Sequence, residues 1–303
     1  MLHMLDQGGA FASPLRYPGG KGRLGPWLAA LMRANGLKGG CYAEPYAGGA
    51  GAALFLLLQG HAGRIVINDA DPAIYAFWDC VVNRTDAFVT KIIRTPTTME
   101  ARALAKQVLE QPGNYEPLEV GFAAFLLNRT SRSGILNGGV IGGKAQSGAY
   151  RLDARYKKDN LIARIRTIGG IREKIQVHGL DALDFFERVG ERLPPKKSLI
   201  YLDPPYYVKG SQLYRNSYQH DDHVAVGELV KSQTRPVLVT YDDASAIRKI
   251  YKGMDWTLFS LKYSTHLSRP LASEILFYKN LSLPMPPTLT RGASLAGELR
   301  AAT

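Results

Sequence analysis

The segment YAEPYAGGAGAAL, residues 42–54, joins a short apolar run to a second one through a turn dense in glycine. Gly48, Gly49 and Gly51 permit positive φ angles and let a ligand approach the backbone closely where a helix begins. A buried strand, a glycine turn and a helix are typical of α/β domains, which bind ligands at the carboxyl ends of parallel strands. The segment therefore predicts an α/β fold with a nucleoside-binding turn.

The acids around this turn indicate which ligand it holds. The next apolar run, residues 64–67, is followed by Asn68 and Asp69. The distance in sequence from the glycine turn to Asp69 is typical of an acid that accepts the hydroxyl hydrogens of a ribose. Glu44 precedes the glycines, where its negative charge would repel a phosphate, and the strict GxGxxG pattern is missing. This disfavours a dinucleotide and favours a phosphate-free ligand with a cationic end, such as S-adenosylmethionine.

The segment SLIYLDPPYY, residues 198–207, indicates the chemistry. Asp203 follows an apolar strand, and Pro204 and Pro205 stiffen the chain and donate no backbone hydrogen bond. Asp203 and the Pro204 carbonyl can each accept one hydrogen of an exocyclic amine, which frees the nitrogen lone pair to attack a sulfonium methyl group. Tyr206 can stack on the face of a base. The segment predicts methyl transfer to the amino group of a base.

The remaining sequence predicts two discontinuous parts and a tail. Apolar periodicity predicts further strands and helices, including a helix capped by Asp71 with Pro72 at its first position and a closing antiparallel pair over 256–261 and 274–278. We predict a catalytic domain over 1–84 and 171–280, a mostly helical insertion over 85–170 that ends in a glycine-, serine- and arginine-rich stretch, and a mobile tail over 281–303.

Composition adds the class of partner. Lys and Arg number 38 and Asp and Glu 26, and the net charge of +12 suits a polyanion such as nucleic acid. No apolar run approaches the roughly 20 residues of a membrane helix, and residues 1–13 lack a signal-peptide pattern, so we expect a cytoplasmic protein without a membrane partner. Cys41 and Cys80 have no metal-ligand spacing and are expected to be buried free thiols, and no metal is expected.

Six blocks in order resemble the Dam-type DNA adenine-N6 methyltransferases over residues 14–280. They are RYPGGK at 16–21, EPYAGGAG at 44–51, NDADP at 68–72, FLLNRTSRSG at 125–134, LDPPYY at 202–207 and TYDD at 240–243. The resemblance implies a Rossmann-like S-adenosylmethionine-dependent methyltransferase sheet with an inserted, mostly helical target-recognition domain. It also implies adenine-N6 methylation of double-stranded DNA by base flipping. Such a protein would be bacterial, archaeal or phage-encoded and would act at the nucleoid. Its role would be in restriction-modification or in regulation.

The resemblance also implies residue roles. The implied catalytic residues are Asp203, Pro204, Pro205 and Tyr206. The implied cofactor-binding residues are Tyr17, Lys21, Glu44, Pro45, Gly48, Gly49, Gly51, Asp69, Asp181 and Asp203, with Asp184 as the alternative to Asp181 beside the cofactor adenine. The implied DNA-binding residues are Asn128, Arg129, Arg132, Ser133, Asn137 and Lys144.

Several alternatives remain open at this stage. Cytosine N4 is the nearest rival target, although related cytosine enzymes often carry serine where Asp203 stands. A DNA-binding module without catalysis is the rival from another class, and a solvated loop is the rival for the arginine-rich stretch. Arg132 and Ser133 replace an aromatic–asparagine pair of GATC-specific members, so GATC specificity is not carried over. One fold carrying both sites is compatible with a monomer.

Overall fold

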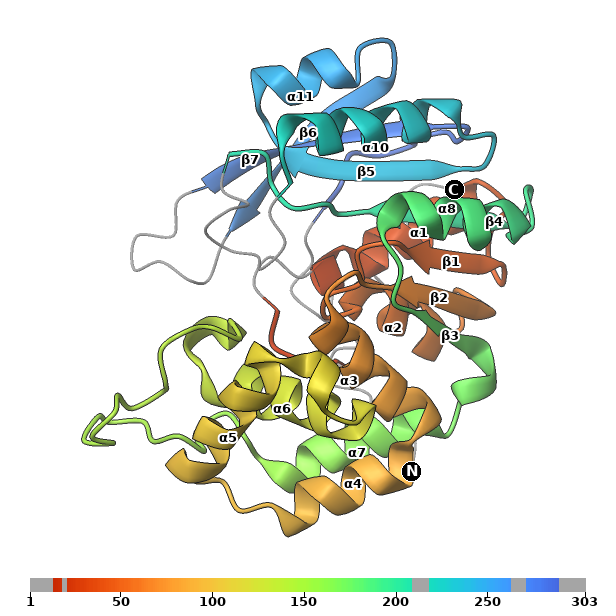
Figure 1. The fold of residues 1–303 in the computed structure, drawn as a ribbon. Helices are drawn as coiled ribbons and strands as arrows, with labels where there is room; N and C mark the ends of the chain where they lie inside the picture. The colour runs from red at the N-terminus through yellow and green to blue at the C-terminus, as the bar shows by residue number, and fades with distance from the viewer. Residues whose placement is uncertain (1–12, 18–20, 209–217, 263–270, 289–303) are drawn as a thin grey trace. The chain divides into compact units, whose positions relative to one another are not determined.

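The computed structural model describes residues 13–17, 21–208, 218–262 and 271–288, which form two compact units (Figure 1). The first unit contains residues 21–68 and the described residues from 180 onward, and the second contains residues 13–17 and 69–179. Three sequence predictions lie outside the described residues: the interpretation of residues 1–12, the block positions 18–20 and the tail over 289–303.

Six strands of the first unit lie in the order β2-β1-β4-β5-β7-β6. Their bounds are β1 Cys41–Glu44, β2 Arg64–Asn68, β4 Ser198–Leu202, β5 Val237–Asp242, β6 Asp255–Lys262 and β7 Leu271–Lys279. The pairs β1–β2, β1–β4 and β4–β5 are parallel, whereas β7 pairs antiparallel with β5 and β6. The α/β class and the closing antiparallel pair that the sequence predicts are both confirmed.

The central strands are buried along their whole length, because parallel strands are covered on both faces. The first unit also contains η3 Lys21–Leu24, α1 Gly25–Ala34, α2 Gly51–Leu58, α8 Ala182–Arg188, η7 Gly190–Arg192, α10 His220–Ser232 and α11 Ser245–Ile250. The core combines strand residues such as Ile200 and Val239 with Phe185, Val226 and Ile247 from helices. This packing fixes the carboxyl ends of β1, β4 and β5, where the candidate site lies.

The second unit is mostly helical. It contains α3 Pro72–Asn83, α4 Thr85–Arg94, α5 Met99–Glu110, η4 Pro112–Asn114, α6 Pro117–Thr130, η5 Arg132–Gly134, α7 Lys158–Gly169, η6 Arg172–Lys174 and β3 Ile175–His178. The Asp71 carboxylate caps α3 by accepting from the Ala73 N–H at 2.9 Å, with Pro72 at the first helical position, as the sequence predicts. Phe77, Phe88 and Phe125 pack with ring centroids 5.6–5.8 Å apart in its core.

Some features differ from the sequence analysis or extend it. The helices α7 and α11 are not predicted from the sequence, and α11 is too short for a periodic pattern to stand out. Ser282 and Met285, in the segment expected to be a mobile tail, hydrogen-bond to Asn35 and Trp27 of the first unit. Cys41 and Cys80 are buried free thiols, as expected. Among the described residues, no helix has the length and apolar character to span a bilayer.

Candidate active site

Asp203 lies directly after β4, a strand whose five residues are all buried. The apolar strand fixes the backbone up to Leu202, and Pro204 and Pro205, both buried, restrict the chain beyond it. The Asp203 side chain remains 21 % exposed. The fold therefore presents one carboxylate at the end of a rigid strand, in a position where a substrate can reach it.

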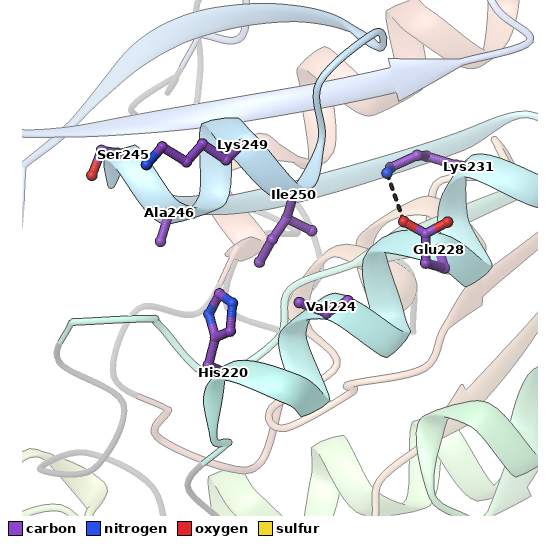
Figure 2. Close-up of a pocket in the computed structure, with 8 residues that line it drawn as sticks. All are labelled: His220, Val224, Glu228, Lys231, Ser245, Ala246, Lys249 and Ile250. Carbon is purple, nitrogen blue, oxygen red and sulfur yellow. Dashed lines mark hydrogen bonds and ion pairs between the residues drawn. The ribbon is translucent and has the colours of Figure 1, made fainter.

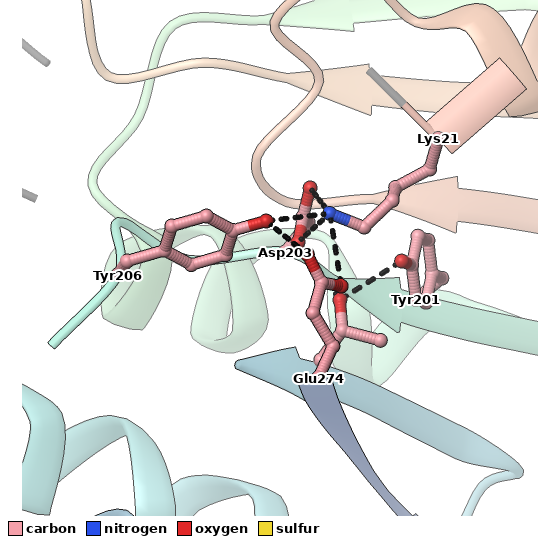
Figure 3. Close-up of polar contacts among 6 residues, drawn as sticks. Lys21, Tyr201, Asp203, Tyr206 and Glu274 are labelled. Carbon is pink, nitrogen blue, oxygen red and sulfur yellow. Dashed lines mark hydrogen bonds and ion pairs between the residues drawn. The ribbon is translucent and has the colours of Figure 1, made fainter. Parts of the chain in front are cut away.

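Lys21 holds this carboxylate from η3 (Figure 3). Its Nζ lies 2.9 Å from Oδ1 and 3.0 Å from Oδ2 of Asp203, 3.2 Å from the Tyr206 hydroxyl and 3.5 Å from Oε2 of Glu274. The Tyr206 hydroxyl in turn donates a hydrogen bond to Oε1 of Glu274. We call Lys21, Asp203, Tyr206 and Glu274 the Lys21 cluster. It gathers one cation and two carboxylates beside the predicted catalytic turn.

Burial alone would lower the pKa of Lys21, whose side chain is only 5 % exposed. The charges of Asp203, Tyr206 and Glu274 outweigh that effect and raise the Lys21 pKa well above its ordinary value. Lys21 is therefore an ammonium throughout the physiological range. The Lys21 ammonium therefore donates to both oxygens of the Asp203 carboxylate and fixes its position.

Two hydroxyls on neighbouring strands orient Asp203 from the other side. Oγ1 of Thr240, on β5, donates to Oδ1 of Asp203 at 2.8 Å. The hydroxyl of Tyr201, on β4, lies 2.9 Å from the same Thr240 oxygen and so donates to it. A carboxylate has roughly four accepting positions, and these contacts together with Lys21 leave room for a further donor. Asp203 can therefore accept an amine N–H without losing the contacts that fix it.

The turn after the predicted catalytic tetrapeptide, residues 203–206, is fixed by Asp242 at the end of β5. The Asp242 carboxylate accepts the backbone N–H groups of Tyr207 at 2.8 Å and Val208 at 2.9 Å. The ring of Tyr206 is buried, with Lys21 Nζ 5.4 Å from its centroid. Tyr206 is thus anchored by its hydroxyl, and its predicted stacking on a base stays a prediction.

The glycine turn after β1 approaches the same region. Ala50 and Gly48 have φ angles of 46° and 47°, which let the chain turn into α2. A Cβ at Gly51 would lie 3.1 Å from the Gly22 Cα, so the residue beside Lys21 packs closely against the start of α2. Gly49 and Pro45 are buried in the same turn. A side chain at position 51 would require Gly22 to shift by a few tenths of an ångström.

Glu44 is a buried acid at the end of β1. Its Oε1 accepts from the Tyr42 hydroxyl at 3.0 Å and from the Ala53 N–H at 3.2 Å. Burial is the main cause that raises its pKa to about 8, with a smaller contribution from the Asp203 charge. Among the described groups that shift this pKa, none is a cation. A ligand with a positive charge would therefore stabilise the ionised form of Glu44.

Other predicted cofactor residues occupy separate places. Pro45 is one of them, and its carbonyl accepts a hydrogen bond at 2.9 Å from Asn68, which also donates to the Leu180 carbonyl at 2.9 Å. Asp181 caps α8 by accepting from the Leu183 N–H at 2.9 Å, while the rival Asp184 lies 3.6 Å from Arg188. In the second unit, Asp69 accepts from the Asp71 N–H at 3.0 Å, and Tyr17 is partly buried.

The predicted DNA-binding residues separate into two groups. Asn128 is 1 % exposed and donates to the carbonyls of Arg16 at 2.7 Å and Gly134 at 2.8 Å, while it accepts from the Arg16 N–H. It therefore fixes the backbone of the second unit. Ser133 has a φ angle of 57° and is partly buried. The exposed residues of the set are Arg132, Asn137 and Lys144.

Arg129 lies among other arginines of the second unit. It donates to the carbonyls of Arg155 at 2.7 Å and Pro14 at 3.5 Å. Burial and then the charges of Arg16, Arg164 and Arg155 lower its pKa to about 10. We call Arg16, Arg129, Arg155 and Arg164 the arginine group. Its concentrated positive charge favours an anionic partner.

No sequence motif identifies Glu274, Tyr201 or the contacts of Thr240, although Thr240 lies in a matched block. A single acid at the start of an otherwise apolar strand was the signal available for Glu274. Figure 2 shows another hollow, between α10 and α11, where Glu228 and Lys231 pair at 2.8 Å. It contains no member of the Lys21 cluster. No group of three or more metal-ligating side chains occurs among the described residues.

One comparison with known proteins bears on this site. Residues 17–111 match the family described as D12 class N6 adenine-specific DNA methyltransferase. The match includes Lys21, the glycine turn and Asp69, and it confirms the resemblance to the Dam-type family over this part of the chain. No curated protein matches the chain.

Proposed function

We propose that the protein is a DNA methyltransferase that transfers a methyl group to the N6 amino group of adenine in double-stranded DNA. The observation that carries the proposal is the Asp203 carboxylate, held by Lys21 at 2.9 Å and Thr240 at 2.8 Å at the end of a buried parallel strand. The match to an adenine-specific family over residues 17–111 favours adenine over cytosine N4.

S-adenosylmethionine is the proposed methyl donor. Its sulfonium supplies an activated methyl group when it is bound. The buried Glu44, with a raised pKa and no cation among the described groups that shift it, fits a ligand with a positively charged end. Asp69 is the proposed ribose acceptor, and Tyr17 and Asp181 are proposed further contacts.

Asp203 and the Pro204 carbonyl would activate the adenine amine. Each accepts one N–H, so the nitrogen lone pair leaves conjugation with the ring and can attack. Lys21 and Thr240 hold the Asp203 carboxylate in place. Since the amine of a stacked and paired base is out of reach, we propose that the target adenine is flipped out of the duplex. Tyr206 is the proposed stacking partner.

The second unit is proposed to bind the DNA target. The arginine group supplies positive charge. Arg16, Arg129 and Arg164 donate hydrogen bonds to backbone carbonyls, which carry no net charge and so do not neutralise these arginines. Arg132, Asn137 and Lys144 are exposed and could read or position the duplex. The net charge of +12 supports a polyanionic partner.

Methyl transfer to unmethylated genomic DNA tests the proposal. The protein is incubated with labelled S-adenosylmethionine and the DNA is digested to nucleosides. We expect the label in N6-methyladenine. Label in N4-methylcytosine would keep the mechanism and refute the choice of base. Cofactor binding without labelled DNA would refute the proposed substrate, and absence of cofactor binding would refute the proposed donor.

A further inference from the structure

Glu274 is a buried acid that no sequence motif identified. It lies on β7, opposite Asp242 of β5 and Phe259 of β6, and is 1 % exposed. Burying a carboxylate is costly unless it is paired and hydrogen-bonded. The groups that offset this cost are Tyr206, in the predicted catalytic turn, and Lys21.

Its two oxygens contact two different groups (Figure 3). Oε1 accepts from the Tyr206 hydroxyl, and Oε2 lies 3.5 Å from Lys21 Nζ. Lys21 thus stands between two carboxylates, with Asp203 nearer at 2.9 Å. Its single positive charge is shared between two negative charges.

We propose that Glu274 is a positioning residue for methyl transfer, which holds Lys21 and Tyr206 so that Asp203 stays a strong acceptor for the substrate amine. The inference rests on the proposed function. A lysine whose only anionic partner was Asp203 would bind that carboxylate more fully and weaken it as an acceptor. Glu274 draws the ammonium partly away and also fixes the far end of the tetrapeptide through the Tyr206 hydroxyl.

A purely structural role for Glu274 predicts something different. In that case its loss would lower stability and the amount of folded enzyme, but would leave kcat of the remaining folded enzyme unchanged. Charge sharing predicts that removal of Glu274 lowers the pKa of Lys21, because a negative charge near a buried ammonium is lost. The Lys21 titration therefore tests the charge sharing, and kcat of the folded enzyme separates positioning from a purely structural role.

The test compares Glu274→Gln, Glu274→Asp and the exposed control Glu228→Gln. For each protein, kcat and KM for DNA methylation are measured across pH 7–10. The Lys21 ammonium is titrated by NMR of ¹³C-labelled lysine in the ligand-free protein, with Lys21→Arg used to assign the signal. The NMR measurement needs neither cofactor nor DNA.

For Glu274→Gln we expect kcat to fall by about 10- to 100-fold, with KM for DNA within about twofold. The Lys21 titration, followed in the ligand-free protein, should move to lower pH by about one unit or more. Glu274→Asp keeps the charge, so its titration should stay near that of the wild type while kcat falls less. Glu228→Gln should match the wild type in every measurement.

An unmoved Lys21 titration in Glu274→Gln, or an unchanged kcat, would overturn the inference. If Glu274→Gln does not fold, Tyr206→Phe removes the hydroxyl that Glu274 accepts, and an unchanged kcat in that variant would also overturn it. A wild-type protein that does not methylate DNA would refute the proposed function instead. The Lys21 titration would in that event still decide whether Glu274 shares the lysine.

Discussion

Replacing Lys21 by methionine removes the cation of the Lys21 cluster and leaves two carboxylates facing each other. The side chains of Lys21 and Glu274 are 5 % and 1 % exposed, so solvent cannot take over the role of the ammonium. Removing one partner of a buried ion pair typically destabilises a protein by about 3–5 kcal/mol. We expect Lys21→Met to lower the free energy of unfolding at pH 7 by that amount.

The pH dependence of this loss follows from its cause. A carboxylate that is buried without a cation is stabilised by protonation, so the deficit of Lys21→Met should shrink as the pH is lowered from 7 to 5. In the wild type, the raised pKa of Lys21 means that its contribution is fully present below the ordinary lysine value. That contribution is lost only as the pH rises through the folded-state pKa.

Urea unfolding at pH 5 and pH 7, followed by circular dichroism and tryptophan fluorescence, measures the deficit. Lys231→Met is the matched control, because Lys231 pairs with Glu228 at 2.8 Å on the surface and should contribute only about 0–0.5 kcal/mol. The double variant Lys21→Met/Glu274→Gln should recover part of the loss. A deficit below about 1 kcal/mol, or one that does not depend on pH, would refute the reasoning.

Three further perturbations follow from the described contacts. Glu44→Gln should stabilise the ligand-free protein at pH 7 by an amount on the order of 2 kcal/mol and weaken S-adenosylmethionine binding, because the pKa of Glu44 is raised to about 8. The gain in stability should vanish near pH 4.5, and a gain independent of pH in urea unfolding would contradict this. Arg155→Gln should reduce the slope of log affinity for DNA against log salt by about 1, and an unchanged slope in binding titrations would remove it from the DNA contact. Gly121→Ala should lower the free energy of unfolding in urea by about 1–3 kcal/mol, because the new Cβ would lie 2.6 Å from the Ala76 carbonyl oxygen. Gly113→Ala is the control, because a Cβ there meets open space, and equal stability of the two variants would argue against this close packing.

The strand ends that form the candidate site could be predicted because each is written locally in the sequence. Asp203 follows an apolar run and precedes two prolines, and Glu44 precedes a glycine turn. A short apolar run that is followed by a proline pair or a glycine turn predicts both the strand and the residue at its carboxyl end. The cap of α3 by Asp71 was predictable for the same reason, since the cap and Pro72 are adjacent.

The contacts among these strand ends could not be predicted in the same way. Glu274 lies 71 residues beyond Asp203, and only the antiparallel register of β7 on β5 brings it near the tetrapeptide. Thr240 lies on β5, the parallel neighbour of β4, and donates to Asp203 from there. Threonine is a common residue, and no spacing in the sequence marks this one. Asn128 is predicted to contact DNA from its place in a matched block, whereas its side chain is 1 % exposed and donates to the Arg16 and Gly134 carbonyls. Its burial depends on the packing of residues 13–17, which is not a local property.

The most direct test of the central claim compares methyl transfer by the wild type and Asp203→Asn in a single turnover, with cofactor and DNA both saturating. Asparagine keeps the size of the side chain and removes the charge that accepts the amine hydrogen and pairs with Lys21. The account predicts that N6-methyladenine forms about 10²- to 10³-fold more slowly in Asp203→Asn, while cofactor and DNA binding persist. A variant that forms N6-methyladenine within tenfold of the wild-type rate would contradict the assignment of Asp203 as the residue that activates the amine.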